Sequence, residues 1–425
     1  MSLNSIEDIA TYIVADGKGI LAADESNPTC GKRFNSIGVE STEVNRRDYR
    51  EMLFRSKGMK GNIGGVILFD ETIRQSAADG TLLRDLITSQ DALPGIKVDK
   101  GLQPIDDCPG ETVTVGLDGL DERLKEYSSM GAKFTKWRAV INIGDGIPTD
   151  KCIDANMQAL ADYAKCAQDN GMVPIVEPEV LMDGVHSIDD CYDASASSLK
   201  SLFDHLEKKG VNKKGTILKP NMVTSGKDSD IQASIGEVAK RTLECLTENV
   251  PSDLPGIAFL SGGQSDILAT AHLDAMNKIG GFSWKLSFSY GRALQAAALQ
   301  AWGGKPENVF ISEDEFLYTE KSGQIFKFNK GEISEIKGLP DIYVRGQGGL
   351  LDIAIHPNYK ENKVIFFTAS SPLGEEKGGN TALWKAQLKN NDLINLKLLY
   401  KGEENSTKGQ HFGSRIIFDK MNNVY

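Results

Sequence analysis

Short apolar runs alternate, over the first three quarters of the chain, with longer segments whose apolar residues recur at helical spacing. We predict strands at 20–23, 65–69, 95–98, 134–143, 173–177, 216–219, 257–260 and 284–288. The clearest helical patterns cover residues 41–56, 120–129, 153–170, 230–247 and 266–278. Strands alternating with helices favour a parallel sheet, and eight such units favour an α/β fold of the closed TIM (β/α)8-barrel type.

The pattern changes after residue 305. Residues 309–425 contain short alternating strands separated by Gly, Asn and Lys-Gly turns, as in EDEFLYTEKSGQIFKFNKGEI and NKVIFFTAS. Such a pattern predicts an all-β module built of hairpins. The junction AWGGKPENV has the glycine and proline content of a boundary, so we expect two domains, 1–306 and 307–425.

Charged residues end five of the predicted strands, where apolar residues would be usual. They are Asp24 after the first strand, Lys97 and Asp99 at the third, Lys136 and Arg138 at the fourth, Glu177 and Glu179 at the fifth, and Lys219 at the sixth. Residues two apart on a strand share a face. Because the carboxyl ends of barrel strands meet at one rim, these groups are expected to converge on one site, whereas a single lysine there is usually only solvated.

Lys136 and Lys219 suggest the chemistry of this site. A lysine that lies beside another cation in an apolar setting has its ammonium form disfavoured, so its amine can attack a carbonyl. Lys219 follows the apolar residues Thr-Ile-Leu and is the better nucleophile, with Lys136 as its electrostatic partner. Glu177 and Glu179 are two carboxylates whose pKa values should separate, leaving one as proton carrier and the other as ionised support.

Two glycine-containing turns indicate phosphate binding. Ser261-Gly262-Gly263 follows the seventh predicted strand, and Ser289-Tyr290-Gly291-Arg292 follows the eighth. Glycine lets backbone amides approach an oxyanion, and a helix start favours negative charge. Turns need glycine in any case, but many TIM barrels hold phosphate at these two strands. Arg33 and Lys97 could hold a second phosphate across the mouth.

Composition narrows the function further. A net charge of −11 argues against a general nucleic-acid binder. No apolar run is long enough to cross a bilayer, and the amino terminus lacks the pattern of a signal peptide. The six cysteines show no metal spacing, which favours reduced thiols in the cytoplasm. Residues 1–306 have only three histidines, His186, His205 and His272, without ligand spacing, so no metal is expected.

Residues 10–304 resemble class I fructose-bisphosphate aldolases. The matching strings, in order, are GKGILAADES, KRFNSIGVE, GGVILFDET, GIKVDKG, GLDGLDERL, FTKWRAV, GMVPIVEPE, LKPNMV, FLSGGQS and SFSYGRALQAAALQAWGG. The resemblance implies glycolytic cleavage of fructose 1,6-bisphosphate to dihydroxyacetone phosphate and glyceraldehyde 3-phosphate, without a cofactor. It also implies an oligomer, by analogy a tetramer, that acts on sugar phosphates and binds neither nucleic acid nor membrane.

The resemblance assigns roles to individual residues. Lys219 would form the imine with the ketose C2, Glu177 would carry protons, and Asp24 would take the C4 hydroxyl proton. Glu179 would support the lysine network, and Lys136 and Arg138 would shape the field around the imine. The C1 phosphate would be held by Ser261, Gly262, Gly263, Ser289, Gly291 and Arg292, and the C6 phosphate would lie near Arg33 and Lys97.

The aldolase match ends near Asn308, before the family's last helix and its tail with a catalytic tyrosine. The chain ends in Tyr425, but the preceding residues resemble soluble quinoprotein aldose sugar dehydrogenases, which are six-bladed β-propellers using pyrroloquinoline quinone (PQQ). The strings are FLYTEKSGQIFKF, RGQGGLLDIAIHPNY and HFGSRIIFD. That resemblance would make His411 a general base and Gln347 a cofactor contact, with His356 structural. An incomplete propeller cannot close, so we expect neither PQQ and calcium binding nor sugar oxidation.

Three alternatives to an active aldolase remain. A transaldolase-like Schiff-base barrel is disfavoured by two phosphate turns together with Arg33. A quinone-dependent sugar oxidoreductase would act through the C-terminal segment. The last is a catalytically impaired fusion that acts as a scaffold.

Overall fold

The computed structural model describes residues 3–305, 315–329, 332–374, 377–409, 412–419 and 423–424. The chain divides into two compact units, Met1–Ile311 and Ser312–Tyr425, and each has its own hydrophobic core. His411 and Tyr425, for which the sequence raised possible roles, lie outside the described residues. None of the helices in the described ranges combines the length and apolar character needed to cross a membrane.

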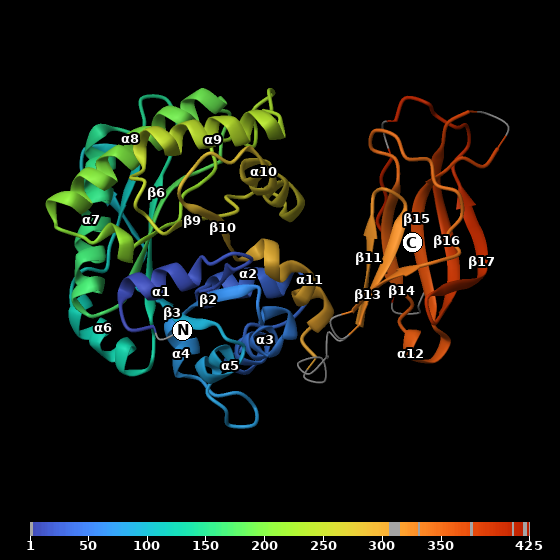
Figure 1. Ribbon diagram of the computed structural model, residues 1–425, viewed down its shortest axis with the longest axis horizontal. Coiled ribbons are helices and arrows are strands. Elements are labelled where there is room, and N and C mark those ends of the chain that lie inside the picture. The colour runs from blue at the N-terminus through green and yellow to red at the C-terminus, as the bar shows by residue number, and fades with distance from the viewer. Residues whose placement is uncertain are drawn as a thin grey trace. The chain divides into compact units, whose positions relative to one another are not determined.

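The first unit is a closed barrel of eight parallel strands in the order β1-β10-β9-β8-β7-β6-β3-β2 (Figure 1). These strands are β1 Gly19–Ala23, β2 Ile63–Leu68, β3 Leu93–Lys97, β6 Phe134–Ile141, β7 Val173–Val180, β8 Ile217–Leu218, β9 Gly256–Phe259 and β10 Lys285–Tyr290. All eight predicted strands are present, with ends shifted by a few residues, and the predicted TIM barrel is confirmed. β8 is the shortest, and Lys219 directly follows it.

Helices surround the barrel on the outside (Figure 1). They are α1 Ile6–Ile13, α2 Asn27–Asn35, α3 Glu43–Arg55, α4 Asp70–Arg74, α5 Leu83–Ser89, α6 Leu120–Ser129, α7 Asp150–Asp169, α8 Ile188–Lys208, α9 Ile235–Asn249, α10 Asp266–Ile279 and α11 Arg292–Trp302, with 3-10 turns η1 Lys57–Met59 and η2 Lys213–Gly215. Serine or threonine side chains cap several helix starts, and Ser187 and Asp190 form a capping box on α8. The five clearest predicted helices are confirmed.

Aromatic rings fill the barrel where glycines leave room. A Cβ atom at Gly95 would lie 2.3 Å from the ring of Phe134, and one at Gly19 would lie 2.2 Å from the ring of Phe288. At the amino-terminal end, α1 packs against the barrel, because a Cβ at Gly64 would lie 2.2 Å from the carbonyl oxygen of Ile13. The interior is therefore packed, and the functional cavity lies at the opposite, carboxyl-terminal rim.

A two-stranded antiparallel hairpin, β4 Leu102–Ile105 and β5 Cys108–Thr114, is inserted between β3 and α6. The sequence pattern did not reveal it, because β4 is short and largely exposed and the residues that β5 buries are mainly polar, as Glu111 and Thr114 are. The base of the hairpin matters for function, since Gly101 and Leu102 line the cavity described below.

The second unit is all-β, as predicted. It contains a three-stranded antiparallel sheet of β11 Glu315–Glu320, β12 Gln324–Asn329 and β13 Glu332–Ile336. A four-stranded antiparallel sheet follows, with β14 Leu350–Ile355, β15 Val364–Ser371, β16 Asn380–Lys389, β17 Asp392–Lys401 and the short helix α12 Tyr359–Asn362 beside it. Residues of both sheets share one core, and this arrangement fits the predicted partial propeller.

Candidate active site

One cavity of about 480 Å³ is lined by every candidate site residue of the barrel. Its lining includes Asp24, Arg33, Lys97, Lys136, Arg138, Glu177, Glu179, Lys219, Ser261, Gly262, Gly263, Ser289, Gly291 and Arg292. These side chains come from different strands and from the loops that follow them. The expected convergence at the carboxyl ends of the strands is therefore present in the fold.

Lys219 lies at the centre of this cavity. It is only 4% exposed, and its Nζ lies 2.9 Å from Glu177 Oε1. The other oxygen of the same carboxylate, Glu177 Oε2, lies 3.3 Å from Lys136 Nζ. Lys136 Nζ in turn lies 2.7 Å from Asp24 Oδ2. Two amines and two carboxylates thus form a continuous chain of ion pairs, in which Glu177 bridges the lysines.

The ionisation of these groups follows from burial opposed by neighbouring charge. Burial raises the pKa of the Asp24 carboxyl, but the charges of Lys136 and Lys219 outweigh it and hold the pKa well below its usual value. The same balance lowers the pKa of Glu177. Burial lowers the pKa of Lys136, but Asp24, Glu177 and Asp99 outweigh it and raise that pKa. Lys136 is therefore the permanent cation, and both carboxylates can accept protons.

Asp99 extends the cluster toward the mouth of the cavity. Its Oδ1 lies 3.3 Å from Lys97 Nζ, and its Oδ2 lies 3.9 Å from Lys136 Nζ. On the other side, Arg138 donates a hydrogen bond to Glu179. Glu179 thus holds Arg138 in place. Asp99 is the carboxylate that connects Lys136 to Lys97.

The turn after β9 has the geometry of an anion site. Gly262 and Gly263 have φ angles of +55° and +89°, which residues with side chains rarely adopt. Arg292 donates hydrogen bonds to the carbonyl oxygens of Gly263 (3.0 Å) and Gln264 (2.9 Å). Because Arg292 begins α11, it fixes this turn against the loop that follows β10.

The end of β10 and the start of α11 supply donors of their own. Ser289 is 2% exposed, and its Oγ is buried without a hydrogen-bond partner among the described residues. Gly291 stands at the amino end of α11, where no side chain caps the first turn of the helix. An unused hydroxyl and uncapped helix amides beside the cavity are the features that bind phosphate oxygens.

Helix α2 presents a polar face of which the sequence interpretation named only Arg33 and left out Ser26 and Thr29. Ser26, Thr29 and Arg33 recur at helical spacing, and all three line the cavity. The hydroxyls of Ser26 and Thr29 lie 3.1 Å apart, and Ser26 makes no side-chain cap to its helix. Arg33 lies on the β10 side, since a Cβ at Gly291 would be 3.5 Å from Arg33 Nη2. The recurrence of Ser26, Thr29 and Arg33 at helical spacing, soon after Asp24, was the feature of the sequence that could have revealed this polar face.

No group of three or more metal-ligating side chains occurs within the described ranges. His272 is buried, and its Nδ1 lies 2.6 Å from Gln264 Oε1, so it supports the turn after β9. In the second unit, His356 Nδ1 accepts hydrogen bonds from the Asn358 backbone (3.0 Å) and from the Asn362 side chain (2.9 Å). Gln347 is exposed.

The barrel matches known proteins closely. Residues 5–337 match the family model "Fructose-bisphosphate aldolase class-I". A probable fructose-bisphosphate aldolase class 1 of Xanthomonas axonopodis is 52% identical over 318 residues, 75% of this chain and 95% of that protein. A cytosolic fructose-bisphosphate aldolase of Arabidopsis thaliana is 49% identical over 74% of this chain and 80% of its own length. The structure of the Plasmodium falciparum aldolase has a TM-score of 0.71 at 47% identity, covering 72% of this chain and 88% of that one.

Residues 305–425 match the family model "Glucose / Sorbosone dehydrogenase". A crystal structure of glucose dehydrogenase is 27% identical with a TM-score of 0.26, over 27% of this chain and 34% of that one. The two family matches overlap at residues 305–337, and within this overlap the described residues form β11, β12 and β13.

Proposed function

This chain belongs to the class I fructose-bisphosphate aldolase family, and on that premise we propose that it cleaves fructose 1,6-bisphosphate through an imine on Lys219. The observation that carries the proposal is the contact of Lys219 Nζ with Glu177, 2.9 Å away, inside a cavity that also holds Asp24 and Lys136. The products are dihydroxyacetone phosphate and glyceraldehyde 3-phosphate.

The first half of the reaction joins enzyme and substrate. The amine of Lys219 attacks C2 of the ketose, the carbonyl oxygen leaves as water, and a positively charged iminium remains. Glu177 contacts the amine and has a lowered pKa, so it can take the proton that the nitrogen loses and pass it to the carbonyl oxygen. A second proton, taken from solvent, completes the water that leaves and accounts for the positive charge of the iminium. Lys136 keeps its charge beside both groups and stabilises the anionic form of Glu177.

The second half breaks the C3–C4 bond. Asp24 accepts the proton of the C4 hydroxyl, the bonding electrons move into the iminium, and the aldehyde leaves while an enamine stays on Lys219. A lowered pKa keeps Asp24 ionised and ready for this step. Protonation of the enamine and hydrolysis release the ketose phosphate. Since the iminium is the electron sink, we propose that no metal is required, and chelator treatment should leave the rate unchanged.

We further propose that two phosphate positions hold the substrate. Ser289, Gly291 and the glycine turn at 261–263 suit the C1 phosphate, with Arg292 bracing them. Lys97, together with the hydroxyls of Ser26 and Thr29, suits the C6 phosphate. Arg33, which the resemblance put near the C6 phosphate, lies beside Gly291 and suits the C1 phosphate instead. A bisphosphate therefore fits the cavity better than a monophosphate.

Borohydride trapping tests the proposal. Reduction in the presence of dihydroxyacetone phosphate should attach the ketose phosphate covalently to residue 219, detected by mass spectrometry, and Lys219→Ala should abolish the adduct. Lys214→Ala, at an exposed lysine of the same segment, serves as the matched control. If the unaltered chain gave no adduct on Lys219, the barrel would be a scaffold rather than an aldolase.

We propose that the protein is cytoplasmic, since its six cysteines are free thiols. By analogy with the family, we also propose that it forms a homo-oligomer, a tetramer. We attribute no sugar oxidation to the second unit. Assays with added PQQ and calcium should give no glucose turnover, and turnover would assign the second unit an activity of its own.

A further inference from the structure

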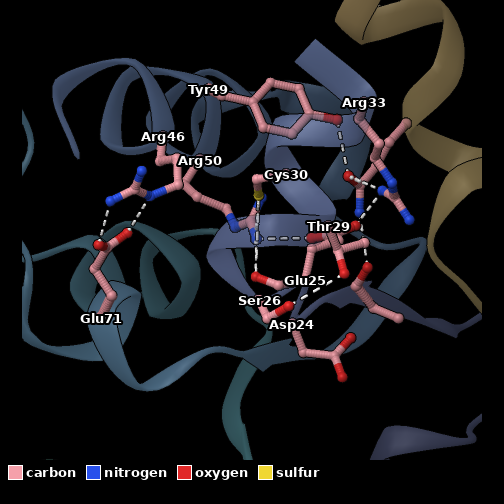
Figure 2. A network of polar contacts seen from close by, with 12 residues as sticks. Asp24, Glu25, Ser26, Thr29, Cys30, Arg33, Arg46, Tyr49, Arg50 and Glu71 are labelled. Carbon is pink, nitrogen blue, oxygen red and sulfur yellow. Dashed lines mark hydrogen bonds and ion pairs between the residues drawn. The ribbon is translucent and has the colours of Figure 1, made fainter. Parts of the chain in front are cut away.

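A buried set of polar groups lies behind Arg33 (Figure 2). It begins at Arg50 on α3, which is 2% exposed and whose Nη2 lies 2.7 Å from Glu25 Oε2. The other oxygen of Glu25 accepts a hydrogen bond from Arg33 Nη1. A fully buried guanidinium thus fixes a carboxylate that in turn holds a side chain of the cavity wall.

Gln295 on α11 supports Arg33 from a second side. Its Nε2 donates to the carbonyl oxygen of Ala22 (2.7 Å), so its Oε1 faces the opposite way. That oxygen accepts hydrogen bonds from Arg33 Nη1 (3.0 Å) and from the Tyr49 hydroxyl (2.8 Å). Because Tyr49 and Arg50 are neighbours on α3, the contacts close into a ring that returns to the same helix.

The ring of hydrogen bonds and ion pairs engages Nη1 of the Arg33 guanidinium, and Nη2 is left on the side of the cavity. Nη1 binds both Glu25 and Gln295. Nη2 instead lies near Gly291, at 3.5 Å from the position of a Cβ there. Gly291 is the N-cap residue of α11, whose first turn has no side-chain cap and favours an anion. A phosphate at this turn would therefore meet an arginine that is already oriented.

We propose that Glu25, Arg50, Tyr49 and Gln295 are positioning residues that fix Arg33 for a phosphate at the turn between β10 and α11. This inference rests on the proposed function of the cavity and adds how one of its cations is held. A free arginine loses side-chain entropy when it binds an anion, and one ordered beforehand loses less. Glu25 belongs to the cavity wall, whereas Arg50, Tyr49 and Gln295 lie outside the cavity lining and act through Arg33.

Tyr49→Phe is the sharpest test, because it removes only the hydroxyl. The ring keeps its packing against Phe34 and Trp302, whose ring centroids each lie 5.4 Å from that of Tyr49. Inorganic phosphate, used as a competitive inhibitor of the full chain, reports on the anion site. Loss of one buried hydrogen bond should weaken its inhibition about threefold to tenfold. Tyr127→Phe, at a buried tyrosine that donates to Asp70 (2.8 Å) outside the cavity, should not change it.

A double mutant separates positioning from a general structural effect. In an Arg33→Ala background, Tyr49→Phe should produce no further weakening, since the group that it positions is gone. If the effect persisted in full in that background, or if Tyr49→Phe alone had no effect, the proposal would be overturned. The proposed function would survive either result as long as borohydride still trapped the ketose on Lys219.

Discussion

Lys219 Nζ and Glu177 Oε1 lie 2.9 Å apart, while the second oxygen of Glu177 faces Lys136 at 3.3 Å. Among the described ion pairs, Glu177 is therefore the only carboxylate that contacts both Lys136 and Lys219. Its carboxylate can move a proton to or from the nitrogen of Lys219 while its charge is compensated from the other side. The first prediction follows from this double contact.

Glu177→Gln should slow imine formation by about 100-fold or more, because the amide cannot carry the proton. Binding of inorganic phosphate should be unchanged, since the described ion pairs of Glu177 are with Lys136 and Lys219 and not with residues of the glycine turns. Rapid-quench borohydride trapping measures the first quantity and inhibition measures the second. Glu207→Gln, at an exposed position of α8, is the control. An adduct that formed at the normal rate would remove Glu177 from the mechanism.

The second prediction concerns pH. Asp24 must be ionised to accept the hydroxyl proton, and Lys136 at 2.7 Å helps to hold its pKa below the usual value. Lys136→Met removes that charge while burial remains, so the pKa of Asp24 should rise. The acid limb of the cleavage rate against pH should then move to higher pH.

The position of this limb, rather than the absolute rate, is the measurement. Arg241→Met removes an exposed ion pair with Asp189 on the outside of the barrel and should leave the limb in place. A limb that kept its position in Lys136→Met would mean that another group than Asp24 controls cleavage.

The third prediction concerns stability. A Cβ at Gly95 would meet the ring of Phe134 at 2.3 Å inside a packed barrel. Gly95→Ala should lower the free energy of unfolding by about 1–3 kcal/mol, measured by denaturant titration. Gly236→Ala, in α9 with no atom within 4 Å of the new Cβ, should raise it by about 0.5–1 kcal/mol. Equal effects at the two sites would contradict the packing argument.

The fourth prediction concerns the second unit. The first unit has its own core and contains the whole cavity. A chain shortened to residues 1–306 should fold and cleave fructose 1,6-bisphosphate with the kcat/KM of the full chain. Steady-state kinetics on both proteins provide the comparison. A large loss of kcat in the shortened chain would show that residues after 306 contribute to catalysis.

The barrel and the central cluster could be predicted because their signals are local. Each strand is a short apolar run that carries or directly precedes a charged group, so the topology brings Lys136, Glu177 and Lys219 together. The expected position at the strand end is wrong for Lys136, because β6 continues to Ile141. The hairpin β4–β5 was missed because β4 is exposed and β5 buries mainly polar residues, so neither strand carries an apolar pattern.

The ring behind Arg33 could not be predicted for a different reason. Gln295 lies more than 260 residues from Arg33 in the sequence, and a lone glutamine on a helix gives no signal of its own. Glu25 and Arg50 are charged, so a sequence pattern places them on the surface, yet they are buried because they compensate each other. Only the packed fold shows which charges are paired.

The bridging position of Glu177 has one more consequence. Lys219 alternates between a neutral amine or enamine and a positive iminium, whereas Lys136, the second lysine that Glu177 contacts, stays positive in one place beside Asp24, Asp99 and Glu177 in every step. Little dipolar reorientation is then needed as covalent bonds are made and broken, and the scaffold can remain rigid while the sugar changes.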